Sequence, residues 1–296
     1  MTTVSNIPAR IREQLRGAPA VTGALQAGRA LIHFGPWRHV ARAIVRRNRP
    51  PLRGDNSRAL IPLHLDTAAL VKTLRADGMA AAGRLPPAVL SRIRAVTDDL
   101  PPGEYGDFHE HSDIDALVRG AEVLDVVRGY IGAEPELLEC TLVVHHAEDP
   151  AGRPIHSQRH FHFDFAGWQS LNLFVYLTDV GQESEAHQVV VGTHRNRPVR
   201  DAIRPWVPDD EIMTRFTERV RTITGPAGTM FFEDTEAFHR RLIMARRRVM
   251  LNVLYASHRS WLSQGRLTPK YLDYVRAHPE LAAHDQRASQ DSRAGS

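Results

Sequence analysis

The chain has 296 residues, of which 42% are hydrophobic and 24% are charged, and a net charge of +4. This is the composition of an ordinary globular protein with room for one large domain or two small ones. Cys140 is the only cysteine, so an intramolecular disulfide and a thiolate metal cluster are excluded. No apolar run is long enough to cross a membrane or to serve as the core of a secretory signal, and we therefore expect a cytoplasmic protein.

Residues 1–60 read as a helical N-terminal extension, because apolar residues recur at helical spacing between Gly-Pro breaks. The last of these patterns places Trp37, Val40, Ile44 and Val45 on one side, with arginines between them. A basic amphipathic helix of this kind either packs on its own protein or makes a peripheral contact with an anionic membrane. The first arrangement is the more common one, and the sequence leaves the role of the extension open.

Residues 61–282 are predicted to form the main domain, which opens with helices. Asp66 is a suitable N-cap for a helix that stops at Asp77-Gly78, and Pro86-Pro87 opens another. A longer helical pattern covers 113–131, with Gly132 as its C-cap. A short strand is expected at 79–82 between the first two helices.

Beyond Gly132 the pattern changes to short apolar strands, expected at 137–146, 160–165, 170–178, 189–191, 230–233 and 249–255. Strands joined by short turns, without alternating helices, favour an antiparallel β-sandwich or barrel. An insertion at 201–219 carries Trp206 and a helix that begins near Asp209. The polar tail at 283–296 is expected to be disordered.

The stretch from His160 to Phe165 alternates polar and aromatic residues. In a strand, His160, His162 and Asp164 therefore share one face, opposite three phenylalanines. Buried imidazoles and a carboxylate need partners, and a metal ion provides one for all of them. A histidine and a carboxylate two residues apart are two of the three ligands in the two-His-one-carboxylate set that holds non-haem Fe(II).

The missing ligand must come from a later strand. His187 lies in a polar loop and His194 in a turn, whereas His239 follows a strand end, which is a sensible position opposite the metal strand. Downstream, Arg248 opens a strand, and an arginine that points into a barrel needs an anion. A dicarboxylate co-substrate would supply that anion through a bidentate pair.

With these residues in place, the chain resembles the phytanoyl-CoA dioxygenase-like family of Fe(II)/2-oxoglutarate oxygenases over Asp66 to Ser257. The resemblance rests on the His162-Phe163-Asp164 motif and on the spacing of nine positions between His239 and Arg248. Three further motifs carry it: Tyr176-Leu177-Thr178-Asp179, Val189-Val190-Val191-Gly192-Thr193-His194 and Gly228-Thr229-Met230-Phe231-Phe232.

The resemblance implies a mainly β fold with flanking helices, a double-stranded β-helix barrel of the jelly-roll or cupin kind. It implies that His162, Asp164 and His239 bind Fe(II), and that Arg248 binds the distal carboxylate of 2-oxoglutarate. The strand residues Asn172, Phe174 and Tyr176 would lie beside the co-substrate. The activity implied is O2-dependent hydroxylation, and Asp164 disfavours halogenation because related halogenases have a small residue at that position.

Two departures from the family bear on the site. Glu185-Ala186-His187-Gln188 stands where the family has an Asn-Gly pair, which changes a loop near the barrel mouth. Arg246 also lies on the inward face of the last strand, so strand alternation permits it as the anchor in place of Arg248.

Other functions remain open at this point. A cupin-type metal enzyme would use His160 with His162, but such sites usually need a glutamate shortly after the histidines, and none follows. A catalytically inactive metal-binding barrel and a merely structural network of buried polar groups are also compatible with these residues.

Specificity is expected in the insertion. Trp206 would form an apolar wall, and Arg200 and Arg204 would meet an acidic group. We therefore expect a small-molecule substrate, aliphatic and acidic, such as a CoA-linked or carrier-linked acyl chain, and no nucleic acid. The sequence does not indicate an oligomeric state.

Overall fold

A computed structural model of the chain describes residues 24, 28, 37–45, 61–145, 160–164, 166–182, 184, 186–195, 197, 199–202, 204, 207–242 and 247–258. Most of the N-terminal extension lies outside these residues, except for α3 (Arg38–Val45). Trp206, Arg246 and the predicted 283–296 tail also lie outside them. No helix in the described part of the chain combines the length and apolarity that a bilayer crossing requires.

The core of the fold is an antiparallel six-stranded sheet with the order β1-β7-β4-β9-β3-β2. Its strands are β1 (Met79–Arg84), β2 (Gly103–Tyr105), β3 (Glu136–His145), β4 (Ser170–Tyr176), β7 (Thr229–Glu233) and β9 (Arg248–Ala256). All seven residues of β4 are buried. A central strand that is buried throughout is expected where both faces of a sheet are covered.

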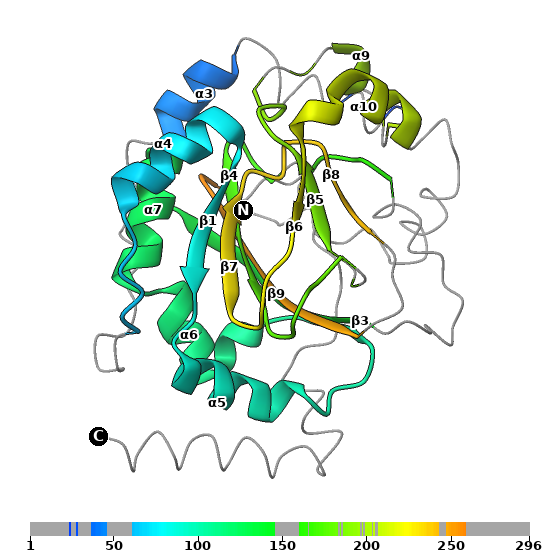
Figure 1. Ribbon diagram of the computed structural model, residues 1–296. Coiled ribbons are helices and arrows are strands. Elements are labelled where there is room, and N and C mark those ends of the chain that lie inside the picture. The colour runs from blue at the N-terminus through cyan, green and yellow to red at the C-terminus, as the bar shows by residue number, and fades with distance from the viewer. Residues whose placement is uncertain are drawn as a thin grey trace.

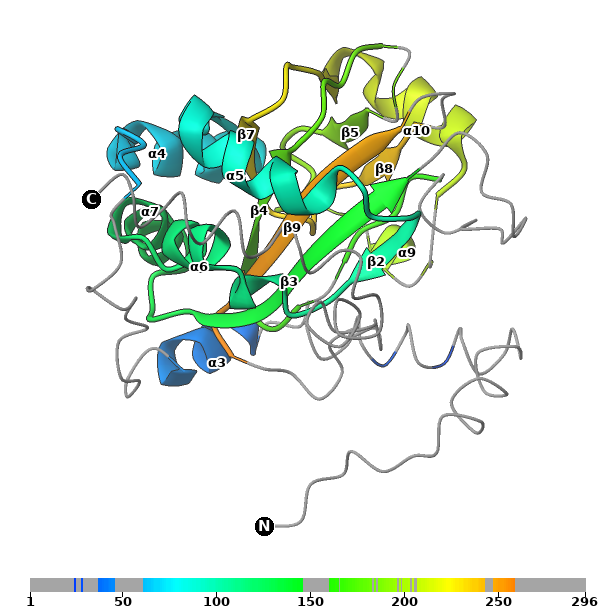
Figure 2. The same ribbon diagram turned by 90° about the horizontal axis from the view of Figure 1, so that it is seen from below.

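Helices cover the outer face of this sheet, as Figures 1 and 2 show. They are α4 (Thr67–Asp77), α5 (Pro87–Thr97), α6 (Ser112–Val118) and α7 (Ala121–Ile131), with a short η1 (Phe108–Glu110) before α6. One hydrophobic cluster joins Leu74 of α4 and Ile93 of α5 to Leu173 of β4 and Leu251 of β9. The inner face of the sheet is thereby left to line the barrel.

The predicted helix caps are present. The Asp66 side chain accepts a hydrogen bond from the Ala69 N–H at 3.0 Å, and Gly78 closes α4 in the left-handed conformation with φ of 81°. The single helix predicted over 113–131 is wrong, because the chain leaves helical geometry between α6 and α7. Gly120 has φ of −61° and ψ of 141°, which is an extended conformation and not a helical one.

A second sheet has the order β6-β5-β8 and contains β5 (His187–Val190), β6 (Val220–Ile223) and β8 (His239–Arg241). Isolated bridges from His162 to His239 and from Phe161 to Val207 extend it. Among the described residues 160–164 of the predicted metal strand, Phe161 and His162 form these bridges, and the N–H of Asp164 donates to the carbonyl of Thr235.

From β3 onward the chain passes back and forth between the two sheets. β3, β4, β7 and β9 belong to the large sheet, and residues 161–162, β5, β6 and β8 to the small one. This alternation produces the double-stranded β-helix, so the predicted fold class, mainly β with flanking helices, is confirmed.

The insertion packs against the outer face of the small sheet and contains α9 (Val199–Ala202), α10 (Asp209–Phe216) and η2 (Thr217–Arg219). The helix predicted to begin near Asp209 is confirmed as α10. Val207 and Ile212 are fully buried in one cluster with Phe161, Phe163 and Phe238. Phe161 and Phe163 thus face outward into this cluster, which turns His162 and Asp164 inward.

Candidate metal centre

His162, Asp164 and His239 come together inside the barrel, with one ligand atom of each within 4.8 Å of the others. Backbone pairing explains the convergence. His162 and His239 exchange both N–H···O bonds, at 3.0 and 2.9 Å, and the N–H of Asp164 donates to the carbonyl of Thr235 at 2.8 Å. The imidazole centroids of His162 and His239 are 4.3 Å apart, and Nε2 of His239 is 3.5 Å from Oδ2 of Asp164.

The hydrogen bonds of both imidazoles prepare their Nε2 atoms for a metal. Nδ1 of His162 lies 2.8 Å from the carbonyl oxygen of His160, and Nδ1 of His239 lies 3.0 Å from that of Ala237. Because a carbonyl oxygen only accepts, each Nδ1 carries a hydrogen, and Nε2 is the nitrogen of each ring that can bind a metal ion. Metal-binding histidines in proteins are held in this way.

The two histidines differ in proton affinity. Burial, followed by the positive charge that His239 can carry, lowers the pKa of His162 to about 4. Burial by itself lowers the pKa of His239, but the hydrogen bond and charge of Asp164, together with Glu233, raise it to about 9. His162 is therefore neutral at neutral pH, whereas His239 holds a proton that a metal ion must displace.

Glu233 and His187 form a second group of ionisable residues behind His239. Nε2 of His187 is 2.8 Å from Oε2 of Glu233, and Nδ1 of His239 is 3.9 Å from Oε1 of the same carboxylate. Glu233 is fully buried and His187 is 5% exposed. His187 was predicted to lie in a polar loop. That prediction is wrong, because His187 is the first residue of β5. The signal for Glu233 was an acid directly after the apolar run Met230-Phe231-Phe232, but Asp234 and Glu236 follow closely and make it look like part of an acidic loop.

Arg248 lies at the start of β9 with only 2% of its surface exposed. It pairs in register with His145 of β3, and its positive charge acts on the buried Tyr176, whose pKa burial raises to about 12. Arg241, also buried, contacts the imidazole of His145 through its guanidinium. His145, the last residue of β3, is itself buried, with 8% of its surface exposed.

The predicted β4 residues all face the barrel interior. The Asn172 side-chain amide donates to Oδ1 of Asn252 at 2.8 Å and accepts from the Thr235 hydroxyl at 3.2 Å. The Tyr176 hydroxyl donates to the Ile223 carbonyl at 2.9 Å and accepts the His187 N–H at 3.2 Å, which ties the two sheets together. Phe174 stacks on Phe231 with 5.1 Å between ring centroids.

Other candidate histidines are not part of this group. The His160 side chain is 47% exposed and lies 3.6 Å from Asp209 of α10. His194 is buried against α4, so closely that a Cβ on Gly78 would meet its Nδ1 at 2.6 Å. Among the described residues, the metal-binding geometry includes His162 without His160.

The arginines of the insertion are engaged by carboxylates of the insertion itself. Arg204 lies 2.8 Å from Glu211, and Arg200 lies 3.7 Å from Asp201. The fully buried Asp201 also forms a 2.6 Å ion pair with Arg215. Arg204 is thereby closely paired, whereas the Arg200 side chain is 67% exposed and its contacts to Asp201 and Glu211 are 3.7 and 3.8 Å long.

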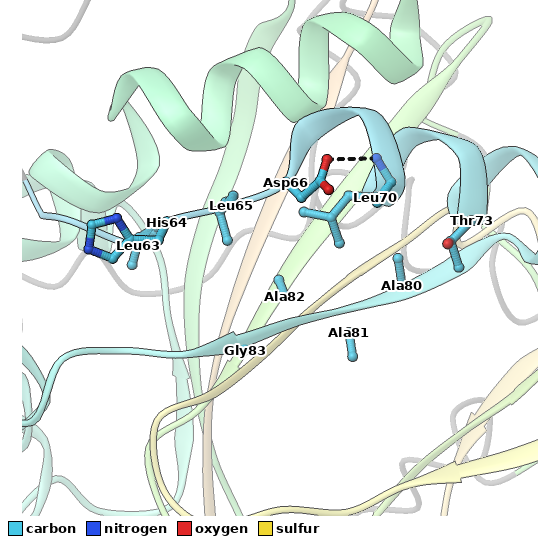
Figure 3. Close-up of a pocket in the computed structure, with 11 residues that line it drawn as sticks. Leu63, His64, Leu65, Asp66, Leu70, Thr73, Ala80, Ala81, Ala82 and Gly83 are labelled. Atoms are coloured by element: carbon cyan, nitrogen blue, oxygen red, sulfur yellow. Dashed lines mark hydrogen bonds between the residues drawn. The ribbon is translucent and has the colours of Figure 1, made fainter.

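A cleft of about 410 Å³ lies on the far side of the large sheet, between β1 and α4 (Figure 3). Leu65, Leu70, Ala80 and Ala82 contribute apolar side chains to it, and Asp66 lies at its rim, engaged in the helix cap. None of the three candidate metal ligands lines this cleft. It is a gap between the helical layer and an edge strand, distinct from the barrel interior.

No family model matches the chain, and no curated protein matches it. Crystal structures with a similar fold include AviO1 from Streptomyces viridochromogenes Tue57, at 18% identity over 69% of this chain and 99% of that chain, with a TM-score of 0.46. The epimerase SnoN in complex with Fe3+, alpha ketoglutarate and nogalamycin RO matches at 16% identity over 64% and 83% of the respective chains, with a TM-score of 0.47. EctD from S. alaskensis with 2-oxoglutarate and 5-hydroxyectoine matches at 16% identity over 77% and 95%, with a TM-score of 0.48. At these identities and TM-scores the likeness concerns the fold alone.

Proposed function

We propose that the protein is an Fe(II)- and 2-oxoglutarate-dependent dioxygenase that hydroxylates an aliphatic C–H bond of a small molecule. The observation that carries the proposal is the convergence of His162, Asp164 and His239 inside the barrel, with Nδ1 of both imidazoles bonded to the backbone and Nε2 left as the metal-binding nitrogen. Two imidazole nitrogens and one carboxylate oxygen are the donor set of non-haem Fe(II) oxygenases, and this set leaves coordination positions open.

The residues present fit the metal. Both imidazoles are fixed by backbone carbonyls, and Asp164, which is half-buried, supplies one negative charge toward a divalent ion. With 2-oxoglutarate and O2 at its open positions, bound Fe(II) would supply substrate oxidation coupled to decarboxylation of the co-substrate.

Arg248 is the residue we propose for anchoring 2-oxoglutarate. It is buried at the end of the barrel beside Tyr176, where a guanidinium can form a bidentate pair with the distal carboxylate. Asn172 and Phe174 would line the same interior, and the stacked Phe174 and Phe231 rings exclude water from it. Arg241 supplies a second buried guanidinium at this end of the barrel.

The test is the consumption of 2-oxoglutarate. Anaerobic addition of Fe(II) and 2-oxoglutarate should give a metal-to-ligand charge-transfer absorption, and exposure to O2 should give succinate even without the substrate. Asp164→Ala removes the carboxylate ligand and should abolish both signals while the protein stays folded. Metal binding without any succinate, under all co-substrate concentrations, would instead identify a catalytically inactive metal-binding barrel.

We also propose a peripheral contact with an anionic membrane through the N-terminal extension. Residues 1–54 contain ten arginines and one acidic residue, Glu13. On α3 and just before it, Trp37, Val40 and Ile44 are 44%, 62% and 67% exposed. Exposed apolar residues on a strongly basic segment are the features by which helices bind at an anionic bilayer surface.

A vesicle co-sedimentation assay tests this contact. Vesicles with 30 mol% phosphatidylserine should retain the protein at low salt and vesicles of phosphatidylcholine alone should not, because the attraction is electrostatic. Val40→Ser together with Ile44→Ser should weaken the binding to anionic vesicles, because the two substitutions remove apolar side chains that would enter the bilayer surface. Both side chains are exposed, so the barrel should stay folded in this variant. Equal binding of the wild type and the double variant to the anionic vesicles would contradict the proposal. Absence of binding to either kind of vesicle would contradict it as well.

A further inference from the structure

Glu233 is a carboxylate that the proposed chemistry does not by itself require. It ends β7 with no exposed surface and points into the barrel interior. A buried carboxylate is costly unless partners compensate it, and an apolar side chain of similar size would fill the same space without that cost. Nε2 of His187 lies 2.8 Å from one of its carboxylate oxygens, and Nδ1 of His239 lies 3.9 Å from the other.

His187 is held in a defined orientation. Its ring lies 5.2 Å from Phe174 and 5.7 Å from Phe231, and it stacks on His239 at 5.4 Å with an interplanar angle of 15°. Nε2 of His187 also lies 2.8 Å from Oε2 of the fully buried Glu233 carboxylate. The imidazole therefore fixes the carboxylate and also covers one face of the His239 ring.

The His239 ring is in contact on one face and along its Nδ1 edge. His187 stacks on one face, His162 lies 4.3 Å away, and the Nδ1 edge meets the Ala237 carbonyl and the Glu233 carboxylate. Only the Nε2 edge, near Asp164, remains for a metal ion. Each of these contacts restricts rotation of the ring.

We propose that Glu233 and His187 are positioning residues that fix the His239 ring and strengthen it as a metal ligand. The inference rests on the proposed function of the metal site. A negative charge beside the Nδ1 edge stabilises the electron-donating ring and partly balances the charge of a divalent ion at Nε2. Outer-shell carboxylates beside metal-bound histidines act in this way, and their loss typically costs about 10–100-fold in metal affinity.

The alternative is an ion pair that only stabilises the fold. The two readings differ in metal affinity, which can be measured without turnover. We would titrate Co(II) into the full-length protein and follow its d–d absorption for wild type, Glu233→Gln and Glu233→Asp, with the melting temperature of each metal-free protein. Glu233→Gln keeps the volume and removes the charge, so the dissociation constant of Co(II) should rise about 10–100-fold. Glu233→Asp keeps the charge at a longer distance and should give an intermediate value.

Asp234→Asn is the matched control. Asp234 is the neighbouring buried carboxylate, and it accepts a 2.5 Å hydrogen bond from Tyr130 of α7, on the helical side of the large sheet. Its replacement should lower the melting temperature and leave the dissociation constant of Co(II) within about twofold of wild type.

The outcomes separate this inference from the proposed function. Failure of the wild-type protein to bind Co(II) would contradict the proposed function itself. If wild type binds Co(II) and Glu233→Gln binds it equally well while melting lower, the pair is only structural and the inference fails. Should Glu233→Gln not fold, Glu233→Asp and His187→Gln decide the question by the same comparison, because each weakens the contact from one side.

Discussion

At the scale of single residues, the proposed role of Arg248 as the co-substrate anchor can be tested directly. Arg248→Lys keeps the charge but loses the planar fork that pairs with a carboxylate through two hydrogen bonds. We expect the KM for 2-oxoglutarate to rise by about tenfold or more, equivalent to about 1.4 kcal/mol or more, with little change in metal affinity. Steady-state succinate formation measures the change. Arg84→Lys, outside the barrel, is the control, and an unchanged KM in Arg248→Lys would exclude Arg248 as the anchor.

Tyr176 offers a prediction on stability. Its hydroxyl donates to the Ile223 carbonyl and accepts the His187 N–H, so one oxygen joins the two sheets. Tyr176→Phe leaves both of these buried groups without that partner, and we expect a loss of about 1–3 kcal/mol in the free energy of unfolding. Urea denaturation measures it. A variant as stable as wild type would show that the link between the sheets contributes nothing.

At the scale of elements, the insertion is held to the barrel by apolar contacts and internally by ion pairs. Asp201 is fully buried, and Arg215 contacts it through both terminal nitrogens, at 2.6 and 3.3 Å. Asp201→Ala leaves the Arg215 guanidinium poorly compensated, and we expect the free energy of unfolding to fall by about 2–4 kcal/mol.

The pair Arg94–Asp98 is the matched control for Asp201. Both of its side chains are more than 40% exposed, at 43% and 45%, so Asp98→Ala should cost less than about 1 kcal/mol. Thermal unfolding of the two variants side by side gives the comparison. Equal losses would mean that the insertion network is no more important than a solvent-screened surface pair.

At the scale of the whole molecule, metal binding should stabilise the fold. The candidate ligands come from the 160–164 segment and from β8, which belong to the same small sheet, and Arg248 comes from the large one. A ligand at one hundred times its dissociation constant adds about 2.7 kcal/mol. For a chain of this size that is a rise of about 5–10 °C in melting temperature.

Calorimetry with Co(II) or Mn(II), with and without 2-oxoglutarate, measures this stabilisation. Mg2+ should add much less, because it prefers an all-oxygen shell. His239→Ala should lose the metal-dependent rise. Its persistence in that variant would place the stabilising metal at another site.

The sequence by itself determined the features that depend on neighbours along the chain. Side-chain alternation gave His162 and Asp164 a common face and Arg248 an inward one, and local hydrogen bonding set the caps at Asp66 and Gly78. The order of short strands was sufficient to predict the barrel, because period-two patterns and turn residues are local signals.

Only the tertiary structure decided which residues meet across strands. Backbone hydrogen bonds bring His239 beside His162, the candidate ligand that lies 77 positions earlier in the chain (239 − 162 = 77). The contact between Glu233 and His187 could not be predicted from the sequence. It joins a strand of the large sheet to a strand of the small one, and no local pattern encodes how the two sheets close on each other. The burial of His145, and the break that Gly120 makes between α6 and α7, were likewise set by packing that overrode the local pattern.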